Sequence, residues 1–211
     1  MVIKFERIIK PITREQAVKE GWLAETSLWS FIDTSGKNKV QIAKQILTQY
    51  HHIMGKTIVF VKTRAELAEI HNHATSLGRK SVALLNQSPD EMDRILDGFS
   101  ANEYDIIVNC SKIGEGVDVK GCTSVMLMKQ FRSYSQLNQY IGRAARPDSE
   151  CYVFELINPL KGNNLDTTIV TGTPKQHFLC SWDTINNQFK EYEFEYASTT
   201  VIGIEPGPKR R

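Results

Sequence analysis

Apolar and polar positions alternate in a regular strand–helix order through the middle of the chain. Short apolar runs of the kind found in strands buried on both faces occupy residues 57–61, 81–85, 105–109, 123–128 and 151–157. Between these runs, apolar residues recur at every third or fourth position, which predicts amphipathic helices. The helices are expected within residues 36–55, 63–78, 88–99 and 133–147. Repeated strand–helix units favour right-handed crossovers and an α/β fold with a mostly parallel sheet.

Residues that cap helices stand where the pattern changes from strand to helix. Thr63 with Glu66, and Ser88 with Glu91, have the spacing of a capping box, in which each member satisfies a backbone N–H of the other. Ser133 is placed to cap the helix that follows it. These signals predict where three of the helices begin.

The alternation is absent from the first 32 residues. This segment holds a candidate strand at residues 2–9, a short helix near residues 14–21 and an apolar stretch at residues 28–32. Nothing in the pattern ties these pieces to the central sheet. We therefore treat residues 1–32 as a segment that precedes the α/β domain.

The alternation also ends after residue 158. Residues 177–182 and 188–196 predict two strands of a hairpin, and residues 207–211 form a basic tail. A polar segment of this size buries little core of its own, so we expect an accessory β-rich extension. The predicted organisation is an N-terminal segment (1–32), a central domain (33–158) and an extension (159–211).

Composition narrows the functional classes. The chain has 211 residues and a formal net charge of only +2, so a nucleic-acid surface has to come from local patches. No apolar run has the length of a membrane span, and the first residues do not form a signal-peptide pattern. The four cysteines and five histidines lack metal-ligand spacing. We expect a cytoplasmic, intracellular protein with reduced thiols, no metal site and no membrane partner.

The most informative string is residues 139–146, with Gln139, Gly142, Arg143 and Arg146 in a Q-x-x-G-R-x-x-R frame. If the helix continues to Pro147, two arginines three positions apart lie on one helical face. The arginine fork is always charged and fits phosphate oxygens, so the pair suits the charge that develops on a transferring phosphoryl group. The alternative is a solvated basic helix.

Three strings in order resemble conserved motifs of superfamily two helicases. Residues 57–63 resemble motif IV, residues 105–118 resemble motif V with its E-G-x-D core, and residues 139–146 resemble motif VI. The arrangement is similar to the second RecA-like domain of a helicase or translocase of the DEAD-like and restriction-translocase branch. The resemblance covers residues 33–158. It implies a RecA-like three-layer domain, with residues 1–32 as the linker after a first motor domain.

The resemblance also implies a nucleotide site. Arg143 and Arg146 correspond to arginine fingers that act on ATP bound by the other domain, and Gln139 corresponds to a residue that couples nucleotide to nucleic acid. Gly116 and Asp118 are expected close to the nucleotide, because glycine lets the backbone approach and a carboxylate accepts from a ribose hydroxyl. The alternatives are a turn glycine with an N-capping aspartate, and a surface amide at Gln139.

A second set of residues is implied in nucleic-acid binding. Hydroxyls, lysines and helix N-termini bind phosphates without reading sequence. The candidates follow the predicted strands and are Val61, Lys62, Thr63, Asn86, Cys110, Ser111 and Lys112. Simple N-capping by Thr63 and Ser111 is the alternative, and the two roles are compatible. Cys110 stands where the family commonly has threonine, and Gln139 stands where many DEAD-box members have histidine.

Aromatic residues offer a weaker suggestion of base stacking. Trp29, Trp182 and Phe189 are the candidates, and packing in the core or in the hairpin is the favoured interpretation for each.

The chain lacks the sequence of a phosphate loop. Residues 55–57 read Gly-Lys-Thr, but Tyr50 stands where the leading glycine belongs, and the string closes a helix instead of opening one. We therefore expect ATP and Mg²⁺ to be bound mainly by a first RecA-like domain, in cis or in trans. The expected nucleic-acid partner is DNA rather than RNA.

Two other functional classes remain open at this point. A non-catalytic nucleic-acid-binding or scaffolding module would keep the same fold without a motor. A dinucleotide-binding domain built on residues 114–116 is disfavoured, because the third glycine of the G-x-G-x-x-G pattern falls at Val119.

Overall fold

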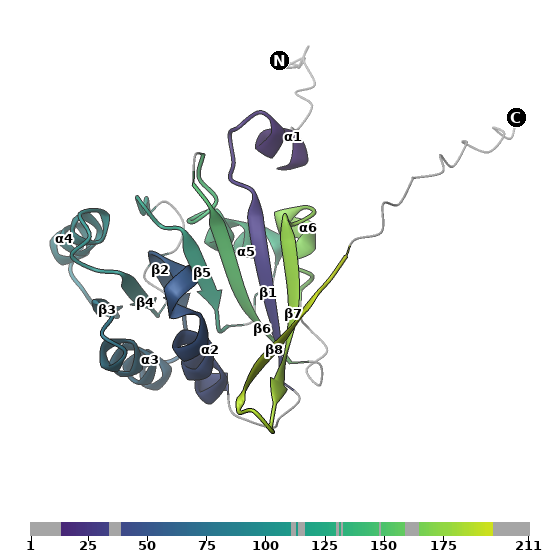
Figure 1. The fold of residues 1–211 in the computed structure, drawn as a ribbon. Helices are drawn as coiled ribbons and strands as arrows, with labels where there is room; N and C mark the ends of the chain where they lie inside the picture. Colours follow the sequence, from purple (N-terminus) through teal and green to yellow (C-terminus); the bar gives the residue numbers. More distant parts are fainter. Residues whose placement is uncertain are drawn as a thin grey trace, which may run out of the picture.

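A single sheet organises the part of the chain that the structure describes. The computed structural model describes residues 14–33, 39–110, 113, 117–129, 131, 133–147, 149–158 and 165–195. Eight strands of these residues pair in the order β3-β4-β2-β5-β6-β1-β7-β8. Helices cover both faces of the sheet (Figure 1).

The first seven strands run parallel, and only the last is antiparallel to its neighbour. The strands are β1 (Thr26–Ile32), β2 (Thr57–Phe60), β3 (Ser81–Leu84), β4 (Ile106–Asn109), β5 (Ser124–Leu127), β6 (Cys151–Ile157), β7 (Gln176–Asp183) and β8 (Gln188–Glu193). The predicted mostly parallel sheet and the predicted C-terminal hairpin are both confirmed. All carboxyl ends of the parallel strands therefore face one edge of the sheet.

Two apolar layers separate the sheet from its helices. The helices are α1 (Arg14–Lys19), α2 (Lys39–Met54), α3 (Arg64–Ser76), α4 (Pro89–Ser100), α5 (Tyr134–Ile141) and α6 (Thr168–Thr171). Successive strand residues point to opposite faces. Ile58 and Phe60 pack with α4, α5 and α6, whereas Val59 and Val61 pack with α2 and α3. The three-layer α/β prediction is confirmed.

The helix starts follow the capping signals. Thr63 and Ser88 each accept a hydrogen bond from the backbone N–H three residues on, and Glu66 and Glu91 bond back, so both capping boxes are present. Ser133 caps α5 in the same way, without a returning carboxylate.

The end of α5 differs from the prediction. The helix was expected to contain both arginines and to close at Pro147, but it ends at Ile141 with Gly142 as its C-cap. Beyond it, the N–H of Arg143 bonds to the carbonyl of Tyr140 at 3.3 Å, a tighter turn than an α-helix makes. Glycine is a poor helix former, and the burial of Ala144 and Ala145 draws the chain toward the sheet.

The sheet crosses the predicted divisions at residues 33 and 159. β1 precedes the first division, yet it pairs with β6 on one side and with β7 on the other. Trp29 and Phe31 of β1 are 5% and 0% exposed. The last seven residues of the predicted linker are therefore a buried strand of the sheet. The sequence pattern did not place β1 in the sheet, because the residues of a fully buried strand do not indicate which strands it pairs with. The candidate strand at residues 2–9 and the basic tail lie outside the described residues.

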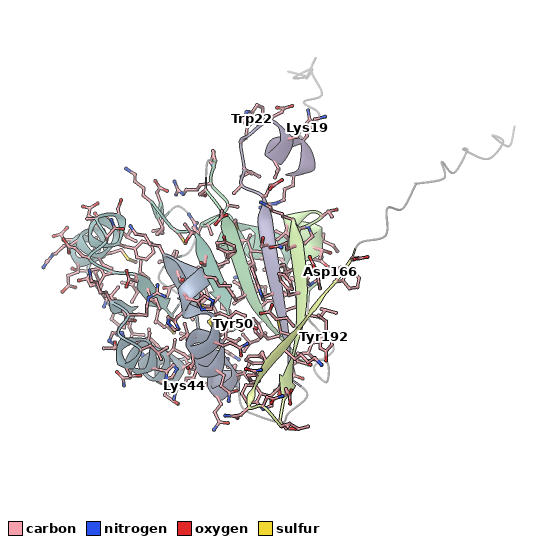
Figure 2. All side chains as sticks on the ribbon, in the orientation of Figure 1. Lys19, Trp22, Lys44, Tyr50, Asp166 and Tyr192 are labelled. Atoms are coloured by element: carbon pink, nitrogen blue, oxygen red, sulfur yellow. The ribbon has the colours of Figure 1, made fainter. Side chains whose placement is uncertain are left out.

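The candidate stacking aromatics pack inside the protein. Trp29 lies against the rings of Phe154 and Phe178, each with a centroid separation of 5.1 Å. Phe189 is 4% exposed and meets the ring of Phe31 edge-on at 4.8 Å. Trp182 meets Phe189 edge-on across the hairpin at 5.0 Å. The packing interpretation is confirmed for all three residues. A well-exposed aromatic ring lies elsewhere, at Trp22 beside α1 (Figure 2).

The cysteines are free thiols. Cys122, Cys151 and Cys180 are buried, and Cys110 is half-buried. Burial raises the pKa of the Cys122 and Cys180 thiols to about 12 and that of Cys151 to about 11. These three thiols are therefore protonated and unreactive at neutral pH. Within the described residues, no cluster of three or more His, Cys, Asp or Glu is arranged to hold a metal. No helix among them has the length and apolar character to cross a bilayer.

A polar network interrupts the core where β1, β6 and β7 meet. The hydroxyl of Ser30 donates to Glu155 Oε1 at 2.6 Å and lies 2.9 Å from His177 Nε2. The hydroxyl of Thr167 donates to the other carboxylate oxygen. Asp166 lies nearby, beside β7 (Figure 2). Burial raises the pKa of Glu155, and the charge of Asp166 adds to this effect, while both hydroxyl donors oppose it. Burial lowers the pKa of His177.

Glu155→Gln is expected to stabilise the fold at pH 8. A carboxyl whose pKa is raised by folding stabilises the folded state below its unfolded pKa, and this contribution is lost as pH rises through the folded pKa. Glutamine keeps an acceptor for Ser30 without the charge. We expect a gain of roughly 1 kcal/mol at pH 8 that shrinks toward pH 5, measured by urea unfolding. Exposed Glu195 provides the control as Glu195→Gln, with no change. A loss of stability at pH 8 would show that the buried charge is favourable.

Candidate functional site

Both arginines of the predicted pair contact the segment just before β5. We call residues 142–147, which follow α5, the arginine loop. Arg143 Nη1 donates to the carbonyl of Val117, and Arg146 Nη2 donates to Asp118 Oδ1. The structure therefore brings Arg143, Arg146 and Asp118 together. Gly116 lies outside the described residues.

The ion pair between Arg146 and Asp118 is partly open to solvent. The Asp118 side chain is 61% exposed and that of Arg146 is 34% exposed. The hydrogen bond from Arg146 holds the pKa of the Asp118 carboxyl below its usual range, and the charges of Lys120 and Arg143 act in the same direction. Asp118 is therefore ionised at neutral pH and acts as an acceptor. An exposed pair of this kind contributes little to stability, so it opens at little cost.

One donor of Arg146 has no acceptor within the described part of the chain. Its Nε atom is buried and makes no hydrogen bond among the described residues. A buried N–H without a partner is costly, and an arginine fork offers five donors in a plane. Because the Nε atom is covered, a new oxygen ligand reaches it only if the side chain moves.

Gln139 lies in the last turn of α5, directly before the arginine loop, and is half-buried. A side chain at this position could transmit a movement of α5 to the arginine loop. Its coupling role stays a prediction.

The second set of candidates gathers at the carboxyl edge of the sheet. We call the residues that directly follow β2, β3, β4 and β5 the carboxyl rim. The thiol of Cys110 donates to the carbonyl of Lys62 at 3.5 Å, and the N–H of Val61 bonds to the carbonyl of Asn109 at 3.0 Å. The structure therefore brings Val61, Lys62, Thr63 and Cys110 together. Asn86 is exposed after the neighbouring β3. Ser111 and Lys112 lie outside the described residues.

The N-terminus of α3 already holds an anion. Glu66 Oε2 accepts from the backbone N–H of Lys62 at 2.8 Å and from that of Thr63 at 3.4 Å. Lys39 Nζ lies 2.7 Å from Glu66 Oε1. Burial acts to raise the pKa of Glu66, but the hydrogen bonds from Lys39 and the backbone outweigh it and lower the pKa. The N-capping interpretation of Thr63 is confirmed. The exposed side chains of Lys62 and Thr63 remain available for phosphate contacts.

A lysine at the rim was not among the sequence candidates. Lys129 Nζ donates to the hydroxyl of Tyr140 at 2.6 Å and lies 4.0 Å from the centroid of that ring. The rings of Phe131 and Phe60 lie 5.5 and 5.9 Å from the same ammonium. We call these four residues the lysine cage. Its only sequence signal was that Lys129 directly follows a predicted strand, a signal too common to single it out.

Comparison with known proteins identifies a family for this chain. The family model described as the helicase conserved C-terminal domain matches residues 38–148. The ATP-dependent DNA helicase RecG of Streptococcus pneumoniae is 34% identical over 110 residues, which cover 50% of this chain and 16% of the relative. The DNA 3'-5' translocase XPB2 of Sulfurisphaera tokodaii is 26% identical over 154 residues, which cover 72% of this chain and 34% of the relative. The chain spans about a third or less of either relative.

Solved structures share the fold. A fragment of a putative HsdR subunit of a type I restriction enzyme from Vibrio vulnificus has a TM-score of 0.64 at 17% identity, covering 83% of this chain and 39% of that one. The C-terminal domain of the DEAD-box protein Dbp5 has a TM-score of 0.62 at 15% identity, covering 78% of this chain and 94% of that one. At such identities the likeness concerns the fold alone.

Thr63→Ala is expected to destabilise the protein by about 1 kcal/mol, because it removes the N-cap of α3. Thr63→Ser keeps the accepting hydroxyl and should retain most of the stability. The matched control is Thr75→Ala, since Thr75 is exposed on the same helix and its hydroxyl only returns to the carbonyl of His71. Urea unfolding measures all three variants. Equal losses for Thr63→Ala and Thr75→Ala would mean that the cap contributes nothing at this position.

Proposed function

Because the chain belongs to the family of helicase conserved C-terminal domains, we propose that it is the second motor domain of an ATP-dependent nucleic-acid helicase or translocase. In this proposal the arginine loop acts on ATP held by a first RecA-like domain, in cis or in trans. The carboxyl rim holds the nucleic-acid backbone. One observation carries the proposal: Arg143, Arg146 and Asp118 meet at one place, although the helix that would have aligned the two arginines ends before them.

Arg146 of the arginine loop has the chemistry of an arginine finger that is bound to an internal partner until the nucleotide is in place. Arg146 is paired with a solvent-exposed carboxylate, and its buried Nε–H has no acceptor among the residues that the structure describes. Bound ATP with Mg²⁺ supplies the phosphoryl group whose charge grows in the transition state. A guanidinium that turns from Asp118 to that charge exchanges one ionised partner for another. This exchange satisfies the Nε–H and frees Asp118.

Asp118, once released, is an ionised acceptor on the same surface. The lowered pKa of Asp118 keeps it charged at neutral pH, so it accepts a hydrogen bond from a ribose hydroxyl. Arg143 supports the loop through its bond to the carbonyl of Val117. Gln139, in the adjoining turn of α5, is proposed to couple nucleotide to nucleic acid.

The carboxyl rim is proposed to contact phosphates and not bases. Lys62 and Thr63 present an exposed ammonium and an exposed hydroxyl beside Cys110. Such groups position a backbone without reading its sequence. Asn86 is proposed to contribute from the next strand, and Ser111 and Lys112 extend the set along the sequence. RecG and XPB2 are both named as acting on DNA, which supports DNA as the proposed partner. We also propose an intracellular location, where the motor has access to ATP.

A non-catalytic binding or scaffolding module is the second candidate. It is favoured by the observation that both arginines find partners within the chain. In that case the arginine loop is a structural connection between α5 and the segment before β5, and it has no role in turnover.

Arg146→Ala in the complete protein is expected to reduce nucleic-acid-stimulated ATP turnover on the order of 10³-fold or more, with nucleic-acid affinity nearly unchanged. The loss falls on turnover because the fork acts on charge that grows in the transition state. Arg146→Lys should restore little, since an ammonium cannot reproduce the planar fork. Steady-state phosphate release measures these rates. Arg94→Ala, on the exposed surface of α4, is the matched control. Parental turnover by Arg146→Ala would support the scaffolding module instead.

The 211-residue chain alone is not expected to hydrolyse ATP, with or without nucleic acid. Hydrolysis requires a phosphate loop and a carboxylate that holds Mg²⁺, and its sequence supplies neither motif. Phosphate release by the purified chain above the level of the buffer would contradict the division of roles between two domains. Addition of a separately produced first domain should restore turnover if the two halves associate.

A further inference from the structure

The lysine cage is a direct contact between the carboxyl rim and the arginine loop. Lys129 follows β5 at the rim, and Phe60 is the last residue of β2, directly before the rim residues Val61 to Thr63. Tyr140 belongs to the last turn of α5. A bond of 2.6 Å from Lys129 Nζ to the Tyr140 hydroxyl therefore joins the proposed nucleic-acid surface to the helix that leads into the arginine loop.

The charge of Lys129 is held without being neutralised. None of the ion pairs within the described residues includes Lys129. Its partners are a phenol hydroxyl and three aromatic rings, all of them neutral. Rings attract an ammonium more weakly than a charged oxygen does. A phosphate that arrives at the rim is therefore a stronger partner than the cage.

Tyr140 is well placed to pass on a change at Lys129. Its ring is 8% exposed and meets Phe60 edge-on at 4.4 Å and Phe131 at 5.1 Å. Its carbonyl accepts the hydrogen bond from the backbone N–H of Arg143 at 3.3 Å. A shift of Tyr140 therefore acts on the first arginine of the loop through a single peptide turn.

We propose that Lys129 is a positioning residue that couples a nucleic-acid phosphate at the carboxyl rim to the arginine loop through Tyr140. Without nucleic acid, the ammonium stays in the cage, and the loop stays closed on Val117 and Asp118. A backbone phosphate takes the ammonium, and the last turn of α5 loses that anchor. The arginine loop is then free to leave Asp118 for the nucleotide. This inference rests on the proposed motor function and names how the nucleic acid regulates it.

A purely structural role for Lys129 predicts different behaviour. An ammonium among three rings has a desolvation cost that an apolar side chain of similar length avoids. Lys129→Met fills the same space and packs favourably with aromatic rings. If packing were its only role, this variant would fold at least as well and turn over ATP like the parent.

The first test measures ATP turnover by the complete protein against the concentration of single-stranded oligothymidylate. Lys129→Met should lower the maximal stimulation on the order of tenfold, a typical size for coupling between two sites. Lys129→Arg should retain most of it, because the guanidinium also binds both rings and phosphate. Tyr140→Phe, which removes only the hydroxyl, should raise turnover without nucleic acid and reduce the stimulation.

Two other lysines serve as controls in that assay. Lys62→Met removes a rim ammonium outside the cage, so it should raise the oligothymidylate concentration needed for half-maximal stimulation while the maximum is kept. Lys80→Met removes an exposed lysine just before β3, outside both parts of the site, and should match the parent. A fall in maximal stimulation for Lys62→Met as large as that for Lys129→Met would overturn the special role of the cage.

The second test needs no ATP. Hydrogen exchange of the amides of residues 141–146 is followed in the 211-residue chain with and without oligothymidylate. Exchange should speed up on addition to the parent and stay constant in Lys129→Met. Unchanged exchange in the parent, or an equal change in both proteins, would contradict the proposed coupling.

Arg146→Ala in the turnover assay distinguishes a failure of the proposed motor function from a failure of the proposed coupling. Parental turnover by Arg146→Ala removes the proposed motor function, and the coupling falls with it. Loss of turnover by Arg146→Ala together with parental stimulation of Lys129→Met and Tyr140→Phe removes the coupling alone.

Discussion

The structure depends on β2, whose four residues are completely buried between its neighbours β4 and β5. A strand buried on both faces satisfies its backbone polar groups only through the ladders on either side. In parallel ladders this requires crossover connections, and these place helices on both faces. The same geometry turns all carboxyl ends to one edge. Lys62 meets Cys110 and Val61 meets Asn109 there because the sheet leaves no other position for the loops that follow its strands.

Two carboxylates at the candidate site bind donors of the same chain. Glu66 occupies the backbone donors at the start of α3, and Asp118 occupies Arg146. An internal partner of this kind costs little to displace when it is exposed, as at Asp118, and more when it closes a capping box, as at Glu66. The rim therefore offers side chains to a phosphate, whereas the arginine loop offers an exchangeable ion pair. Lys129 differs from both, because its neutral partners leave its charge available.

The arginine loop is an irregular segment because α5 ends before it. Gly142 ends the helix, and the buried Ala144 and Ala145 hold the following residues against the sheet. The two arginines consequently approach Val117 and Asp118 from an irregular segment and not from one helical face. Irregular segments of this kind change conformation more readily than helix interiors, because fewer backbone bonds must break. A site that exchanges partners benefits from that property.

From the amino-acid sequence alone we predicted the α/β class, the mostly parallel sheet, the two capping boxes and the terminal hairpin, because periodicity and caps are local signals that neighbouring residues carry in full. The sequence also pointed to the arginines, Asp118 and the rim residues, through motifs that resemble those of a helicase family. Three other features became apparent only in the folded molecule: β1 lies between β6 and β7, α5 stops at Ile141, and Lys129 contacts Tyr140. Each of these depends on contacts between residues far apart in the chain or on competition between a local preference and burial. A one-dimensional pattern shows which residues are able to make such contacts, but packing selects the partners.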